Sequence, residues 1–297
     1  MSNNLNIAFC FFGQVRFFEV IEVYRNWRNS DPNVNIDMFI STWTDFPYEN
    51  EFEDFISINM IDLDDVNDIP WVNQYPRPIY SNTEYMAYHI IEVNKLRQNY
   101  ELENKFKYDY VMFIRTDYLL NEKAFFVNIF KFTDNNLIMN GSVKECPCGL
   151  GWGNPNPDPK TGKVNCGLYV INHDSVWMGS SEIMDIFAKE IYNSFINYKP
   201  LKNTSQREIE RHGGHSFFGT AIKRSKLPVR DIPKSNVNSG IPGMRGLLIR
   251  AHTDLPIFEK YLGIPSSELI NKIMINRQSI ENWRHNRISK WNLDTQN

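Results

Sequence analysis

The sequence predicts an α/β fold with a mainly parallel central sheet flanked by helices. Strand-like and helix-like segments alternate through the first half of the chain, the pattern that builds α/β layers. The strand-like segments are continuous apolar runs, as expected where both faces of a sheet are covered. With 297 residues, of which 42% are hydrophobic, the chain is long enough to bury a core around such a sheet.

Three elements are expected at the start of the chain. Residues 6–12 form an apolar run that ends in GQVR at 13–16, typical of a buried strand and the turn after it. A helix is expected over 17–27. A second strand is expected over 35–42, after the Asp-Pro-Asn turn at 31–33.

A long helix and a central strand follow. The tetrapeptide SNTE at 81–84 is a capping box, and apolar residues recur after it at helical spacing, so we expect a helix over 82–103. Residues 108–114 (YDYVMFI) predict a buried strand that ends abruptly at a charged triplet, RTD.

The second half of the chain is less regular. Prolines and glycines predict a long loop over 146–165, of the kind that often serves as a lid or binding loop. A strand is expected over 167–172, and a helix begins at Ser180 with apolar residues at positions that share one face. Further elements are expected over 214–225 (helix), 247–251 (strand) and 266–283 (helix).

Composition excludes several classes of function. The chain has 32 Lys+Arg against 35 Asp+Glu, which argues against a nucleic-acid binder because neutralising phosphates needs a basic excess. Four cysteines do not make a disulfide framework. The first residues lack the regions of a secretory signal, and no run approaches the about 20 apolar residues that span a bilayer. The sequence therefore predicts a cytoplasmic protein without a membrane span.

The strongest chemical signal is Arg115-Thr116-Asp117 at the carboxyl end of a buried strand, where ligands bind in open α/β sheets. A carboxylate there can hold a divalent cation that bridges two phosphates, and a guanidinium can neutralise a diphosphate leaving group. The alternative is that these side chains pair with neighbours or face solvent.

The second signal is the turn Gly13-Gln14-Val15-Arg16 after the first strand. Glycine permits close backbone approach, the following helix N-terminus favours anions, and Arg16 can reach a phosphate or a sugar. The dinucleotide fingerprint G-x-G-x-x-G is absent. An ordinary strand-to-helix turn is the alternative interpretation.

Taken in order, five segments resemble a group of GT-A-like glycosyltransferases from bacterial and viral surface-glycan pathways. In that group a G-Q-x-R turn ends the first strand, a T-W pair ends the second, and R-x-D stands where most GT-A enzymes carry D-x-D. A later D-x-x-x-x-G-S-x-x-x-M segment is matched from Asp174 to Met184. The segments are IAFCFFGQVRFF, DMFISTW, NTEYMAYHIIEVNKL, KYDYVMFIRTD and HDSVWMGSSEIMDIF.

The resemblance implies a GT-A (Rossmann-like) fold with a C-terminal helical extension and a nucleotide-sugar pocket. It implies one domain over 1–297, with a nucleotide-binding half at 1–120, an acceptor half at 121–260 and a helical segment at 261–297. Trp43 would offer a stacking face for a base or sugar. The implied donor-binding residues are Gly13, Gln14, Arg16, Thr42, Trp43, Asn82, Arg115, Thr116 and Asp117.

The resemblance also implies a divalent cation, Mn²⁺ or Mg²⁺. Asp117 matches the last Asp of D-x-D, the usual metal ligand, and His252 is the natural candidate for a second ligand. Arg115 departs from D-x-D and puts strong metal dependence in doubt. A half-buried histidine bonded to backbone is the alternative for His252.

An inverting transfer also needs a base that deprotonates the acceptor hydroxyl. Asp174 is the first candidate, because it is expected after a strand and before a helix, and His215 is the second. A turn carboxylate that accepts backbone N–H bonds is the alternative for Asp174.

The cysteines carry a weaker signal. Cys146, Cys148, Cys166 and His173 could bind structural zinc, but their spacing matches no standard zinc module. Free thiols are the favoured interpretation.

The sequence thus predicts a glycosyltransferase that transfers a sugar from a UDP- or GDP-type donor to a glycan acceptor. Two alternatives remain: a sugar nucleotidyltransferase, and a non-catalytic glycan- or nucleotide-binding protein on the same fold. The single glycine after the first strand disfavours the former, and Arg115 in place of an acid favours the latter.

Overall fold

The structure is a computed structural model. It describes residues 4–15, 18–44, 52–62, 65, 81–120, 122–130, 135–139, 143–145, 169–171, 175–197, 217–232 and 247–248.

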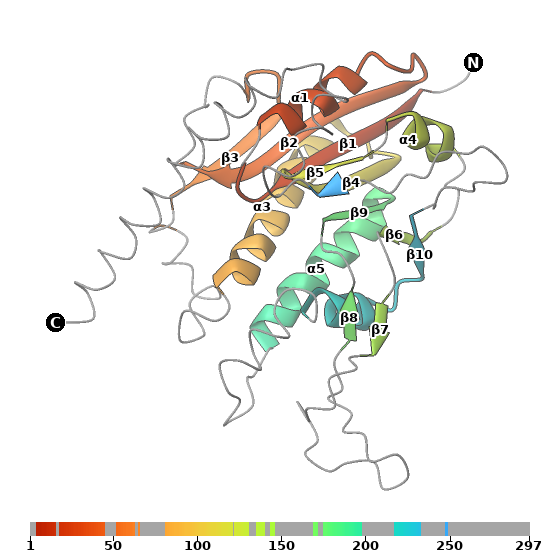
Figure 1. Ribbon diagram of the computed structural model, residues 1–297. Helices are drawn as coiled ribbons and strands as arrows, with labels where there is room; N and C mark the ends of the chain where they lie inside the picture. Colours follow the sequence, from red (N-terminus) through yellow and green to blue (C-terminus); the bar gives the residue numbers. More distant parts are fainter. Residues whose placement is uncertain are drawn as a thin grey trace, which may run out of the picture.

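A seven-stranded sheet, in the order β10-β6-β9-β4-β1-β2-β3, forms the centre of the described structure (Figure 1). β9 runs antiparallel to both its neighbours, and the other neighbouring strands are parallel. The mainly parallel α/β architecture predicted from the sequence is therefore confirmed. The strands are β1 (Leu5–Phe12), β2 (Val34–Trp43), β3 (Ser57–Ile61), β4 (Tyr110–Arg115), β6 (Leu137–Met139), β9 (Val176–Gly179) and β10 (Val229–Asp231).

Helices cover both faces of this sheet. In Figure 1, α1 lies above the sheet and α3 and α5 lie side by side below it. Two small antiparallel pairs, β5 with β11 and β7 with β8, accompany the main sheet. The remaining elements are α1 (Phe18–Trp27), α3 (Ser81–Asn104), α4 (Glu122–Ile129), α5 (Ser181–Asn197), a helix over 217–225, β5 (Tyr118–Leu119), β7 (Val143–Glu145), β8 (Tyr169–Ile171) and β11 (Leu247–Leu248).

The two faces of β1 build two hydrophobic cores. Phe9 and Phe11 pack with residues of α1 and α4, whereas Cys10 and Phe12 pack with residues of α3, α5 and the helix over 217–225. All eight residues of β1 except the first two are buried. This explains why the strand reads as a continuous apolar run: it has no solvent-facing side.

A buried ionic network joins α3 to α5. Arg97 and Glu101, both almost fully buried, form an ion pair of 2.7 Å on α3. Arg97 also donates to Ser181 (2.5 Å) and to Asp185 of α5. Glu101 accepts the backbone N–H of Tyr108 at 3.0 Å, so the network also holds the chain that leads into β4.

Most predicted elements are found with small changes in their ends. The first strand, the second strand and the long helix each agree to within one residue at either end. The central strand begins at Tyr110 rather than 108, because the backbone of Tyr108 is bonded to Glu101 instead of to a neighbouring strand. The segment over 247–248 is extended as predicted. The predicted loop over 146–165 and helix over 266–283 lie outside the described residues.

The helix expected from Ser180 is found as α5, which begins at Ser181. The sequence does not predict β9, which lies between the position of Asp174 and α5. The reason is pairing: Val176 to Gly179 bond to β4 on one side, and Trp177 and Met178 bond to β6 on the other. Four residues are too short to show a strand period in the sequence.

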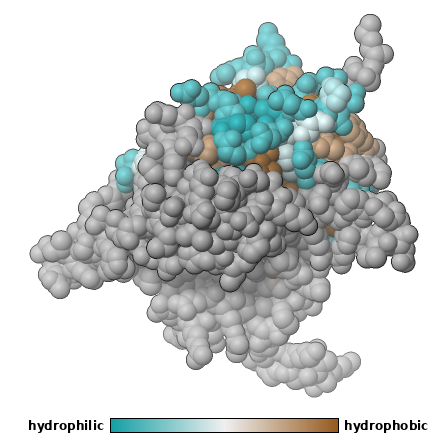
Figure 2. Space-filling view, turned by 45° about the horizontal axis from the view of Figure 1, so that its top comes forward, coloured by the Kyte–Doolittle hydropathy of each residue, from teal (hydrophilic) through white to brown (hydrophobic). Residues whose placement is uncertain are grey.

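One face of the molecule is mainly polar where it is described. In Figure 2, which brings the top of Figure 1 forward, the described residues of this face show mostly hydrophilic colour with smaller hydrophobic areas between. Within the described part of the chain, no helix combines the length and apolar character needed to cross a membrane.

Candidate functional site

The candidate site lies at the carboxyl edge of the sheet, between β1 and β4. From β1 the chain adds β2 and β3 on one side, and it then crosses over to add β4 on the other. Strand order reverses at this point, and in open α/β sheets ligands bind in the crevice outside such a reversal. The structure brings together here the ends of β1, β2 and β4.

Gly13 turns the chain sharply after β1. Its φ is +91°, a conformation that residues with a Cβ rarely adopt, and nothing lies within 4 Å of where a Cβ would be. Its N–H donates to the carbonyl of Ser41 in β2 at 3.1 Å. The glycine is thus required by backbone conformation, and the turn it makes is tied to the neighbouring strand.

A side-chain hydrogen bond connects this turn to the end of β4. Thr116 donates through Oγ1 to the carbonyl of Gln14 at 2.5 Å, and its N–H donates to the carbonyl of Phe12 at 3.4 Å. Thr116 is buried. The GQ turn and the RTD triplet, which were separate signals in the sequence, are therefore in direct contact.

Arg115 and Asp117 form a two-bond fork at the same edge. Nε of Arg115 donates to Oδ1 of Asp117 at 2.9 Å, and a terminal guanidinium nitrogen donates to Oδ2 at 2.7 Å. The side chains are only 14% and 4% exposed, respectively. Planar guanidinium and carboxylate groups joined in this way hold each other in a fixed orientation.

The end of β2 contributes Thr42 and Trp43, both buried. The indole of Trp43 meets the ring of Tyr85 edge-on at 5.2 Å and the ring of His89 at 4.5 Å. Oγ1 of Thr42 is buried and has no hydrogen-bond partner within the described structure. A buried hydroxyl without a partner is rare in folded proteins and often marks a place where a ligand or water binds.

Sequence reasoning missed a polar group beside Trp43. Ser41 Oγ lies 2.9 Å from Nδ1 of His89 and accepts a bond of 2.9 Å from the amide of Asn59. His89 is fully buried, and burial lowers the pKa of its imidazole to about 3, so it is neutral. The available signal was a serine inside a buried strand and a histidine on the core-facing side of a long helix.

Several predicted site residues lie outside the described residues: Arg16, Asp174, His215 and His252. Only the backbone of Asn82 is described, in the first turn of α3. Ser175, which follows Asp174 in the chain, is described and accepts the N–H of Arg115 at 2.9 Å. The amino end of β9 therefore reaches the same edge as the RTD triplet. Cys146, Cys148, Cys166 and His173 are also outside the described residues.

The described residues at this edge do not by themselves make a ready cation site. Both oxygens of Asp117 accept bonds from Arg115. In the described ranges there is no group of three or more His, Cys, Asp or Glu side chains that could hold a metal ion. The expected cation and its expected ligand His252 stay predictions from the resemblance.

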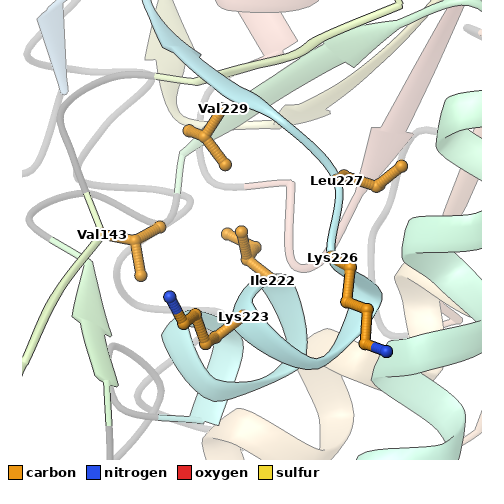
Figure 3. A pocket seen from close by; sticks show the side chains of 6 residues that line it. All are labelled: Val143, Ile222, Lys223, Lys226, Leu227 and Val229. Atoms are coloured by element: carbon orange, nitrogen blue, oxygen red, sulfur yellow. The ribbon is translucent and has the colours of Figure 1, made fainter.

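A cavity of about 340 Å³ lies elsewhere, at the opposite edge of the sheet. Val229 begins β10, which runs parallel to β6, so this residue marks the amino end of the strand. In Figure 3 the side chain of Lys223 extends toward Val143, whereas Lys226 extends away from the cavity. The cavity is thus separate from the ends of β1 and β4. Its lining is Val143, Ile222, Lys223, Lys226, Leu227 and Val229.

In comparisons with known proteins, the match comes from solved structures and not from sequence families. No protein-family model matches the chain, and no curated protein matches it. Among solved structures, the chain is similar to a crystal structure of an active-site mutant of LgtC, a glycosyltransferase. The two share 11% sequence identity with a TM-score of 0.36, over 77% of this chain and 73% of the other.

Proposed function

We propose that the chain is a glycosyltransferase that uses a nucleotide diphosphate sugar of the UDP or GDP type and a glycan acceptor. One observation carries the proposal: the GQ turn and the RTD triplet, which the resemblance assigns to a nucleotide-sugar pocket, are in direct contact at the strand-order reversal of a mainly parallel sheet. Nothing in their separation along the chain required this contact.

The edge has the groups that a diphosphate leaving group needs. Arg115 carries a fixed positive charge, and nothing lies within 4 Å of where a Cβ of Gly13 would be at the reversal point. In the transfer, the acceptor oxygen bonds to the anomeric carbon while the bond from that carbon to the diphosphate oxygen breaks. The electron pair leaves with the nucleoside diphosphate, where a cationic group stabilises the added charge.

The base remains a proposal drawn from the sequence. In an inverting reaction the acceptor hydroxyl would give its proton to Asp174, or to His215 as second candidate. Support for Asp174 comes from its neighbour Ser175, which bonds to the backbone of Arg115.

Thermal unfolding with UDP and GDP, each with and without Mn²⁺, tests the proposal. A nucleotide present at about 100 times its Kd stabilises by about 2.7 kcal/mol, which for a chain of this size raises the Tm by about 5 °C. We expect such a shift with UDP or GDP in the wild type, and almost none in Arg115→Ala. Arg25→Ala is the matched control, because Arg25 of α1 makes the same two-bond fork with Asp54 and is not one of the strand-end residues that form the site.

An unchanged Tm with both nucleotides under both conditions would contradict the proposal and favour the non-catalytic alternative. An equal loss of the shift in Arg25→Ala would also count against it, because the effect would then reflect general damage rather than lost contact at the site.

A further inference from the structure

The inference concerns the charge at the proposed nucleotide site and rests on the proposed function. A cation expected at Asp117 needs carboxylate oxygens as ligands. Both of these oxygens accept hydrogen bonds from the guanidinium of Arg115, at 2.9 and 2.7 Å. A cation would have to compete with a bidentate, charge-assisted pair whose carboxylate is only 4% exposed.

Charge balance at the triplet also opposes a cation. Two acidic residues at 115 and 117 would present two negative charges, whereas Arg115 and Asp117 together present none. If a divalent cation took Asp117, the guanidinium, only 14% exposed, would lose its two bonds to that carboxylate and lie beside a second positive charge. Separating a largely buried ion pair in this way is strongly unfavourable.

We propose that the site binds and releases the nucleoside diphosphate without a divalent cation at Asp117. The electron pair of the breaking bond stays on the diphosphate oxygen, and the guanidinium of Arg115 stabilises the negative charge that the departing diphosphate gains. Asp117 is then a positioning residue: it holds the guanidinium plane in one orientation and contacts neither donor nor metal. This replaces the metal role that the resemblance alone assigns to Asp117.

A titration with Mn²⁺ alone, followed by electron paramagnetic resonance, tests the metal claim without any nucleotide. We expect wild type, Asp117→Asn and the control Asp54→Asn to bind the same amount of Mn²⁺. Bound Mn²⁺ in the wild type whose affinity falls about tenfold or more in Asp117→Asn only would overturn the inference, since loss of a ligand has effects of that size or larger.

A gain-of-binding variant sharpens this test. Arg115→Asp removes the guanidinium and adds a second carboxylate, so we expect Mn²⁺ to bind and to raise the Tm of this variant but not of the wild type. Circular dichroism establishes that the variant is folded. A folded Arg115→Asp protein with no more bound Mn²⁺ than the wild type would contradict the claim that Arg115 is what excludes the cation.

Calorimetric titration with UDP and GDP, in EDTA and in Mn²⁺, tests the positioning role. We expect Kd values that agree within about twofold between the two conditions, and about tenfold weaker binding in Asp117→Asn under both. Binding that requires Mn²⁺ overturns the inference and leaves the proposed function standing. Absence of binding to either nucleotide overturns the proposed function, while the Mn²⁺ titration still decides the metal claim.

Discussion

The imidazole of His89 shows how a single buried residue can set the pH range in which the sheet edge is stable. It lies against Ser41 and Trp43 with no solvent exposure, and burial lowers its pKa from 6.5 to about 3. No charged group contributes to this shift among the described neighbours. The lowered pKa of His89 is therefore caused by desolvation, which disfavours the charged form.

We expect this residue to make the protein less stable in mild acid. Between pH 6.5 and about 3 the unfolded chain binds a proton at His89 that the folded protein does not, so stability falls as pH falls below 6.5. The loss is about 1.4 kcal/mol per pH unit, or about 2 kcal/mol at pH 5. Urea unfolding of wild type and His89→Gln at several pH values measures it.

The readout is the slope of unfolding free energy against pH, so a general loss of stability in the variant does not confuse the result. His89→Phe serves as a second variant, because it keeps a ring against Trp43 while removing the titrating group. If the unfolding free energy depends on pH in the same way in the wild type and both variants, then His89 does not gain a proton on unfolding in this pH range.

At the scale of elements, α3 and α5 are joined by charge rather than by apolar contact alone. Arg97 is fully buried and bonds to Glu101, Asn94, Ser181 and Asp185. Burial would by itself raise the pKa of Glu101, but the bonds from Lys107 and the Tyr108 backbone, with Arg97 and Ser181, together lower it. Its carboxylate is therefore charged at neutral pH, inside the protein.

Removing one member of this network should be costly. We expect Arg97→Met to lower the unfolding free energy by about 3 kcal/mol, because Glu101 would lose its buried cationic partner and keep only the exposed one, Lys107. The double variant Arg97→Met/Glu101→Leu should lose less than the single one. Lys95→Ala is the control on the same helix: its pair with Glu92 is exposed and should be worth under about 1 kcal/mol.

Urea unfolding of the four proteins gives these energies. A double variant that is less stable than Arg97→Met would show that packing, rather than the loss of the buried charge partner of Glu101, explains the loss.

Elements differ in how well the sequence predicts them, for a physical reason. The helix over 81–104 has several turns in which its apolar period can repeat, so its ends are predictable to one residue. β9 has four residues and α4 has eight, too few to show a period. These short elements are held by partners far along the chain, and a local pattern carries no information about such partners.

The lack of long-range information in a local pattern also decides which parts of the candidate site the sequence predicts. Gly13 and the RTD triplet could be recognised because strand ends are visible in the apolar runs that precede them. The fork between Arg115 and Asp117 could not be recognised. Two side chains that are two residues apart in the sequence can face either each other or the solvent. His89 and Ser41 meet only when the sheet order brings α3 across β2.

At the scale of the whole molecule, the sheet order puts the candidate site on two central strands. β1 and β4 pair on both sides, whereas β3 and β10 end the described sheet and are partly exposed. A site at the ends of β1 and β4 is therefore built on strands that neighbours hold on both sides. Such a platform keeps the Arg115–Asp117 fork and the Gly13 turn in one geometry.

Native-state hydrogen exchange tests this view of the whole fold. We expect the amides of β1 and β4 to exchange slowest, through global unfolding, and those of β3 and β10 to exchange faster through local opening. Arg97→Met is expected to lower global stability, and the hydrogen bonds that it removes lie within α3 and between α3 and α5. The opening free energies obtained from exchange in β1 and β4 should therefore fall by about the same amount as the unfolding free energy. Those of the end strands β3 and β10 should stay nearly unchanged.

An equal fall in all four strands would mean that the sheet opens as one unit. Exchange in β1 as fast as in β3 would mean that the candidate site does not lie on a rigid centre.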